Sequence, residues 1–222
     1  MTNRIKIAFF DIDHTIIDND CDVSWKEFLV DQDLAPSESL NDCYKYFDLY
    51  KQGKLPENDF LKFQLKEFRN RALSEMESLS IKHFNGIVKS LIYQEAKIKL
   101  NYFYNKKIPV IGISACNDIV LSPLIKYLKF NHSITTLLEN NNGILSGEIT
   151  GNYVIQNVKP KMVKIFLKRM KLNLAEAAFF SDSINDLPLL ELVGYPFVVN
   201  PDKKLKEIAI SRRWEIVRWQ KF

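Results

Sequence analysis

A short apolar run near the N-terminus ends abruptly in acidic residues, and this stretch constrains the fold more than any other. Residues 5–10 are nearly all apolar, and Asp11, Asp13 and Thr15 follow directly. A strand buried on both faces is almost continuously apolar, and ligands of open α/β sheets bind just beyond the carboxyl ends of such strands. Side chains two positions apart share one face, so the two carboxylates repel each other unless a cation lies between them. The pattern predicts a buried strand that ends at a site for a hard cation such as Mg²⁺, although a polar turn capping the next helix would also fit it.

The rest of the chain alternates short apolar runs with amphipathic segments. Strands are expected at 109–113, 134–138, 177–180, 197–199 and 215–217, a hairpin at 143–151, and helices at 118–128, 159–170, 187–193 and 203–212. Strands that alternate with helices indicate a doubly wound, mainly parallel Rossmann-like sheet, so the predicted fold class is α/β.

A long helical interval separates the first two strands. Apolar spacing of three and four residues predicts helices at 25–30, 40–50, 58–68 and about 74–104. A crossover between parallel strands needs only about a dozen residues. The excess predicts an α-helical cap at 18–82, inserted into a core formed by 1–17 and 83–222.

Composition excludes several classes of function. The net charge of +4 is mildly basic, but aromatic and basic residues do not interleave repeatedly, so nucleic-acid binding is not supported. No apolar run approaches the roughly 18 residues that cross a bilayer, so no transmembrane segment is expected. The three cysteines lack metal-ligand spacing and an even count, which favours a reducing, cytoplasmic setting.

Further polar residues follow the later strands. Ser114 comes after the strand at 109–113, SDSIND occupies 181–186, and a lysine-rich segment, NVKPKMVK, opens the helix near 159. The order of DIDHT at 11–15, Ser114, the lysine and SDSIND resembles the haloacid dehalogenase superfamily of phosphohydrolases, in its phosphoserine phosphatase branch. The segments FFDIDHTIID, DVSW at 22–25 and SDSINDLPLLELVGYPFVVNPD at 181–202 are similar to that branch, and the resemblance covers essentially the whole chain.

The resemblance implies a Mg²⁺-dependent phosphatase that hydrolyses a small phosphate monoester through an aspartyl-phosphate. A carboxylate nucleophile divides this slow reaction into two easier steps. Asp11 would be the nucleophile, and Asp13 would protonate the leaving oxygen and later activate water. Asp182 would complete the Mg²⁺ site with Asp11 and the backbone carbonyl of Asp13. The alternative role for Asp182 is to cap the helix that follows it.

The phosphate group would be bound by Ser114, Lys161 and Asn185, with Thr15 and Asp186 in supporting roles. The lysine register is open, because Lys159 is the alternative to Lys161; the K-M-V-x-x-F pattern favours Lys161. Ser114 could instead only cap the following helix.

Departures from the branch concern the substrate. Asp20 stands where phosphoserine phosphatases have a cap glutamate that holds the substrate amine, and it is a candidate substrate contact. The comparable segment of the insertion has Lys62 but no arginine for a substrate carboxylate, and Ala115 and Cys116 replace glycines. His14 is equally compatible with a structural hydrogen bond and with substrate contact. These differences argue against phosphoserine itself and leave a small phosphorylated metabolite without a named identity.

Three other functions remain as alternatives. A phospho-acceptor signalling module also combines acidic residues, a Ser or Thr and a Lys on a doubly wound sheet, but its acidic pair and its acceptor follow different strands. A catalytically inactive binding protein would not need the complete set of groups. A phosphatase acting on a phospholipid head group would share the chemistry and differ in the cap.

Overall fold

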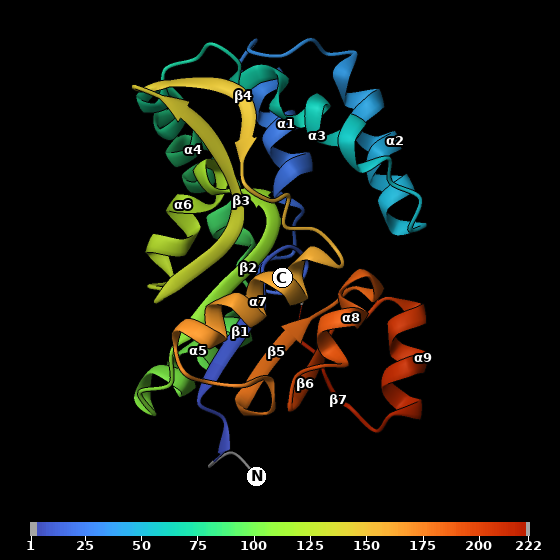
Figure 1. The fold of residues 1–222 in the computed structure, drawn as a ribbon. Helices are drawn as coiled ribbons and strands as arrows, with labels where there is room; N and C mark the ends of the chain where they lie inside the picture. Colours follow the sequence, from blue (N-terminus) through green and yellow to red (C-terminus); the bar gives the residue numbers. More distant parts are fainter. Residues whose placement is uncertain (1–3, 221–222) are drawn as a thin grey trace.

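The structure, a computed structural model, describes residues 4–220 and confirms the α/β fold class (Figure 1). Within these residues, seven strands form one sheet in the order β4-β3-β2-β1-β5-β6-β7, and only the β3–β4 pair is antiparallel. The strands are β1 (Ile7–Asp11), β2 (Val110–Asn117), β3 (His132–Asn141), β4 (Ile144–Thr150), β5 (Ala177–Ser181), β6 (Tyr195–Val199) and β7 (Glu215–Val217). The sheet is doubly wound: β2, β3 and β4 follow one another on one side of β1, and β5, β6 and β7 follow on its other side.

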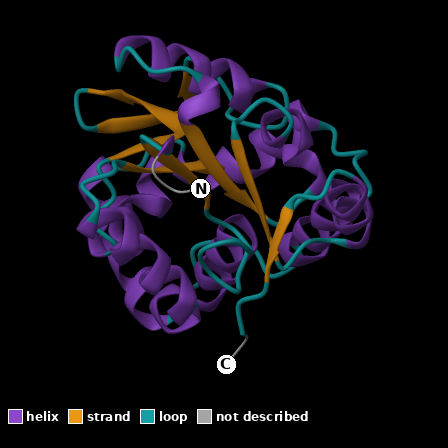
Figure 2. Cartoon of the chain, turned by 90° about the horizontal axis from the view of Figure 1, so that it is seen from below, coloured by secondary structure: helices purple, strands orange, loops and turns teal. Residues whose placement is uncertain are grey.

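The first strand is central because both of its faces are apolar. Ile7 and Phe9 pack against α7 (Val158–Arg169), α8 (Leu187–Leu190) and α9 (Lys203–Ser211) on one face of the sheet. Ala8 and Phe10 pack on the opposite face against α5 (Gln94–Asn105), and α6 (Asp118–Tyr127) lies on that side too. Figure 2 shows the resulting layers, with helices on both sides of the strands. The Phe10 ring also stacks on Phe180 of β5 at 4.3 Å between centroids, which ties neighbouring strands together.

Helices inserted after β1 lie beyond the carboxyl ends of the strands, at the top of Figure 1. They are α1 (Cys21–Asp31), α2 (Ser39–Lys51), α3 (Glu57–Leu65), the short η2 (Lys66–Phe68) and α4 (Leu73–Gly86). The chain leaves the core at 16–18 and returns beside it at 91–93, where Asp18 N–H donates to the Leu91 carbonyl at 2.8 Å and Tyr93 N–H donates to the Ile16 carbonyl at 3.1 Å. The two connections therefore run side by side, and the division of the chain at residues 18 and 82 stays a prediction.

The helical stretch expected at about 74–104 is present, but it is interrupted. It is divided into α4, η3 (Val88–Leu91) and α5. Gly86 ends α4, and Ile87 after it leaves the helical region with φ −124° and ψ −67°. Glycine and β-branched residues disfavour a helix, and pairing with 16–18 holds the returning chain extended.

The hairpin expected within 143–151 is also wrong. Asn142 and Gly143 form the turn between β3 and β4, with φ of 55° and 91°, and β4 continues without turning again. Gly147 lies inside β4, where a Cβ atom would come within 2.8 Å of the Arg69 side chain. This glycine permits close packing against the insertion, because residues 70–73 hydrogen-bond to the start of β4.

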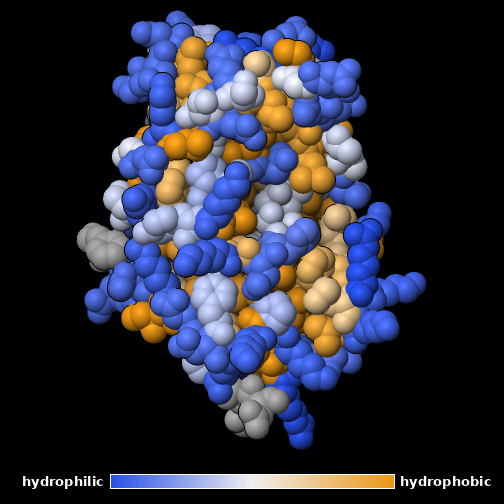
Figure 3. All heavy atoms as spheres, turned by 90° about the vertical axis from the view of Figure 1, so that its left-hand side faces the viewer, coloured by the Kyte–Doolittle hydropathy of each residue, from blue (hydrophilic) through white to orange (hydrophobic). Residues whose placement is uncertain are grey.

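The helices of residues 4–220 are all too short or too polar to cross a bilayer. Figure 3 shows one outer face, where hydrophilic side chains cover most of the surface and apolar side chains gather in small groups between them.

Candidate active site

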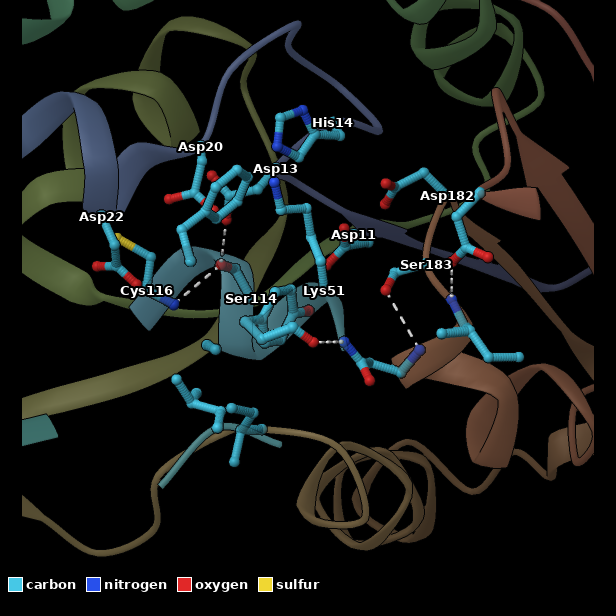
Figure 4. Close-up of a pocket in the computed structure, with 18 of the residues that line it drawn as sticks. Asp11, Asp13, His14, Asp20, Asp22, Lys51, Ser114, Cys116, Asp182 and Ser183 are labelled. Carbon is cyan, nitrogen blue, oxygen red and sulfur yellow. Dashed lines mark hydrogen bonds between the residues drawn. The ribbon is translucent and has the colours of Figure 1, made fainter. Parts of the chain in front are cut away.

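A cavity of about 470 Å³ lies at the carboxyl ends of β1, β2 and β5, beneath the inserted helices. Core residues contribute carboxylates, Ser114 and Lys159 to its wall, and Figure 4 shows the acidic side chains facing the cavity from several segments. The insertion contributes an aromatic wall that includes Phe47, Tyr50 and Phe60. The structure thus brings most of the predicted polar residues together in one pocket.

The most enclosed part of the site is an ion-pair network around Asp11. Lys159 Nζ lies 2.7 Å from Asp11 Oδ1 and 2.9 Å from the Asp186 carboxylate, and all three side chains are buried. Ser181 Oγ donates to Asp186 at 2.7 Å. Burial raises the pKa of Asp11 to about 7 against the opposing effect of Lys159. Burial lowers the pKa of Lys159, but Asp11 and Asp186 outweigh it and hold that pKa above its usual value.

The choice of Lys161 as the lysine beside Asp11 is wrong, because Lys159 makes this contact and Lys161 is exposed. The reason is the phase of α7, which begins at Val158. Lys159 and Val163 are one turn apart and both face the core, whereas Lys161 projects from another side of the helix.

Asp13 follows β1, and its carboxylate is hydrogen-bonded by one group from β2 and one from the insertion. Its Oδ2 accepts a hydrogen bond from Ser114 Oγ at 3.0 Å, and its Oδ1 accepts from the backbone N–H of Cys21 at 2.8 Å. His14 follows with a φ of 55°, and its N–H donates to the Asn19 carbonyl at 3.1 Å. This tight loop turns the Asp13 carboxylate toward the start of α1.

Ser114 does not cap the helix that follows β2. Asn117 has that role, because its side chain accepts from Val120 N–H at 3.0 Å. Ser114 Oγ is instead held by Asp13 and by Cys116 N–H, which donates to it at 3.0 Å.

The Asp182 and Asp11 carboxylates both lie within hydrogen-bonding distance of the Thr15 hydroxyl. Thr15 Oγ1 lies 3.2 Å from Asp182 Oδ1 and 3.3 Å from Asp11 Oδ2. Burial and the charge of Asp11 raise the pKa of Asp182 well above its usual range. Ser183, not Asp182, caps the short helix η5 (Ile184–Asp186), because its hydroxyl accepts from Asn185 N–H. The Asp182 carboxylate is therefore available to the cavity.

The donors near Thr15 fit a hard cation. Asp11 is buried and Asp182 is half-buried. Two neighbouring carboxylates that repel each other, together with the backbone carbonyl of Asp13, are typical oxygen ligands of Mg²⁺. No cluster of three or more His, Cys, Asp or Glu side chains within residues 4–220 is arranged to hold a metal. Ligation here would accordingly need the Asp13 carbonyl and water beside Asp11 and Asp182.

Asn185 lies at the junction with the insertion. Its Nδ2 donates to the Tyr50 carbonyl at the end of α2, at 3.4 Å. It lines the cavity, and its contact with phosphate stays a prediction.

The first turn of α1 holds Asp22, a candidate site residue that the sequence analysis missed, next to Asp20, which it named. Asp20 is the N-cap of α1, and its Oδ1 accepts from Val23 N–H at 2.9 Å. Asp22 also lines the cavity and is hydrogen-bonded by the Cys116 thiol. Burial and the charge of Asp13 raise the pKa of Asp22 to about 7. The sequence does carry a signal for Asp22, because it follows the candidate Asp20 by two residues. The signal was missed because the helix was expected to begin only at residue 25.

Comparisons with known proteins give a consistent result. Residues 8–191 match the haloacid dehalogenase-like hydrolase family. A histidinol-phosphatase of Neisseria meningitidis is 28% identical, over 96% of this chain and 99% of that protein. A phosphoserine phosphatase of Mycobacterium tuberculosis is 26% identical over 94% of this chain and 69% of that protein. Among solved structures, a Bordetella pertussis protein of unknown function superposes with a TM-score of 0.88 at 27% identity, covering 96% of this chain and 98% of that one.

Proposed function

Because the chain belongs to the haloacid dehalogenase-like hydrolase family and is a phosphatase of small phosphate esters, we propose that it acts with Mg²⁺ through an aspartyl-phosphate on Asp11. The observation that carries the proposal is the position of Asp11. This carboxylate stands at the end of the central strand, faces the cavity, and is held by Lys159 on one oxygen and Thr15 on the other.

In the first step Asp11 attacks phosphorus, and the bond between phosphorus and the leaving oxygen breaks. Asp13 donates a proton to that oxygen, so the leaving group departs as an alcohol. In the second step Asp13 takes a proton from water, which attacks phosphorus and releases phosphate and the free Asp11 carboxylate. The Cys21 N–H holds the Asp13 carboxylate in place for both transfers. The Ser114 hydroxyl donates to Asp13 in the free site and has to turn from it to donate to the phosphoryl group.

The phosphoryl group carries negative charge that the site must offset. Lys159 supplies a buried ammonium group beside Asp11, and Asp186 fixes its position. Ser114 and Asn185 supply hydrogen-bond donors from the cavity wall. Asp11, Asp182 and the Asp13 carbonyl would hold Mg²⁺, which neutralises phosphate charge when bound.

The cavity favours a small substrate. Its volume of about 470 Å³ and its cover of inserted helices suit a phosphorylated metabolite better than a folded phosphoprotein. The name of the Neisseria relative supports the phosphate ester of an amino alcohol as one candidate. A cytoplasmic setting stays a prediction, consistent with the free, buried state of Cys21, Cys43 and Cys116.

The test is hydrolysis of p-nitrophenyl phosphate and a panel of phosphorylated metabolites, with Mg²⁺ and with a chelator. We expect multiple turnovers that need Mg²⁺ and are abolished in Asp11→Asn. A signalling module would instead become phosphorylated once and turn over slowly, and an inactive binding protein would release no phosphate.

A further inference from the structure

We propose that Asp22 selects substrates whose leaving group carries a positive charge and no carboxylate, as in the phosphate esters of simple amino alcohols. This inference rests on the proposed function and extends it to the substrate class. It is carried by the position of Asp22 relative to the proton donor and by the lack of a basic side chain paired with it.

The leaving group has to lie on the side of the cavity where Asp22 stands. Asp13 is the group that protonates the leaving oxygen, and its Oδ1 is hydrogen-bonded to Cys21 N–H in the first turn of α1. Figure 4 shows Asp20, Asp22 and Cys116 on one side of Ser114, and Asp11, Asp182 and Ser183 on the other. A phosphoryl group bound at Asp11 therefore directs its ester substituent past Asp13 toward Asp22.

Negative charge gathers at this end of the cavity without a basic partner. No lysine or arginine of residues 4–220 forms an ion pair with Asp20 or Asp22. The charge of Lys26 acts on Asp22, but Lys26 is fully buried and pairs with Glu67 at 2.5 Å. A substrate ammonium group would supply the missing positive charge.

Asp22 is better placed for this role than Asp20. The Asp20 carboxylate accepts from Val23 N–H and is occupied as a helix cap. The Asp22 carboxylate lies two residues further on, lines the same cavity, and within the described chain is hydrogen-bonded by the Cys116 thiol alone. Burial raises the pKa of that thiol, so Cys116 remains a neutral donor.

The rest of the wall suits an amine better than an amino acid. No described arginine lines the cavity to bind a carboxylate. Three further lysines line it. Lys51 does so from the end of α2, where it pairs with Asp48 at 2.6 Å. Lys203 and Lys204 follow Asp202, whose N–H donates to the Asp182 carbonyl on the far side of Asp11. A carboxylate on the leaving group would therefore face Asp22 and be repelled.

The experiment compares three esters that differ by single groups: phosphoethanolamine, its uncharged isostere n-propyl phosphate, and L-phosphoserine, which adds a carboxylate. For the unmodified enzyme we expect kcat/KM for phosphoethanolamine to exceed the other two by at least about tenfold. Asp22→Asn should bring phosphoethanolamine close to n-propyl phosphate, mainly through KM, and leave n-propyl phosphate within about threefold. Asp20→Asn, which keeps a good cap residue, should change the ratio less.

The matched control is Asp31→Asn, at the exposed end of the same helix, which should leave all three esters unchanged. An unmodified enzyme that prefers n-propyl phosphate or phosphoserine, or an Asp22→Asn variant that loses activity equally on all esters, would overturn the inference. Hydrolysis of p-nitrophenyl phosphate in that case would show that the proposed function stands. If no ester is hydrolysed, the proposed function fails and the inference fails with it.

Discussion

The two sides of the cavity are built differently. On the core side, Asp11, Lys159, Asp186 and Thr15 are buried and hold one another through short contacts. On the insertion side, Asp22 forms no ion pair with a lysine or arginine of residues 4–220, and aromatic residues line the cavity beside it. The polar groups of the core side are thus held in place before substrate binds, as catalysis of phosphoryl transfer requires. On the insertion side, the negative charge of Asp22 is left for a positively charged substrate group to balance.

The largest expected effect is on the core side. Asp11→Asn should reduce kcat by several orders of magnitude, because an amide cannot form the covalent intermediate. Circular dichroism and steady-state assays would check that the fold is kept while turnover is lost. Asp31→Asn serves again as the control, and near-normal turnover in Asp11→Asn would remove Asp11 from its role.

A pair of lysine variants tests whether Lys159 is the lysine that supports Asp11 on the same side. Lys159→Met should lower kcat/KM by about 100-fold or more, because the ammonium group beside the phosphoryl group is lost. It should also destabilise the protein by about 3 kcal/mol, because Asp11 and Asp186 stay buried without their cation. Lys161→Met, two residues away and exposed, should change neither the rate nor the urea midpoint by much. Equal effects of the two variants would contradict the assignment of Lys159.

Asp182→Asn tests whether Asp182 is a ligand of the proposed Mg²⁺ ion on the core side. The apparent Mg²⁺ affinity should fall by at least about tenfold, with partial recovery of activity at high Mg²⁺. Titration of activity with Mg²⁺ measures this directly. An unchanged Mg²⁺ dependence with lowered activity would show that Asp182 does not bind the metal.

The smallest expected effect concerns the packing of two helices within the insertion. His83 of α4 is fully buried, its Nε2 lies 2.9 Å from Ser24 Oγ of α1, and burial lowers its pKa to about 4. The unfolded chain therefore binds a proton near pH 6.5 that the folded chain does not, and stability should be lost as the pH falls from about 6.5 toward 4. The loss is at most roughly 3 kcal/mol, and carboxylates with raised pKa values oppose it.

The contribution of His83 can be isolated with His83→Gln. Urea denaturation of both proteins across this pH range should show a difference in unfolding free energy that shrinks as the pH falls. A difference that is independent of pH would mean that His83 does not titrate in this way.

The sequence predicted the core side better than the insertion side, and the residues show why. The strand at 7–11 and the order of its polar partners follow from local patterns, since a doubly buried strand has one obvious signature. The wrong lysine and the missed Asp22 both depend on where a helix begins, because a shift of two residues moves a side chain to another face. The division of the helix at 74–104 depends on hydrogen bonds to residues 16–18, which local spacing does not contain.

The most direct test of the account is to trap the covalent intermediate. Enzyme quenched during turnover is treated with borohydride, which reduces an aspartyl-phosphate to homoserine, and the peptide that contains residues 5–20 is analysed by mass spectrometry. The account predicts homoserine at position 11, dependent on substrate and absent from Asp11→Asn. Continued turnover with no modification at position 11, or modification at another carboxylate, would contradict it.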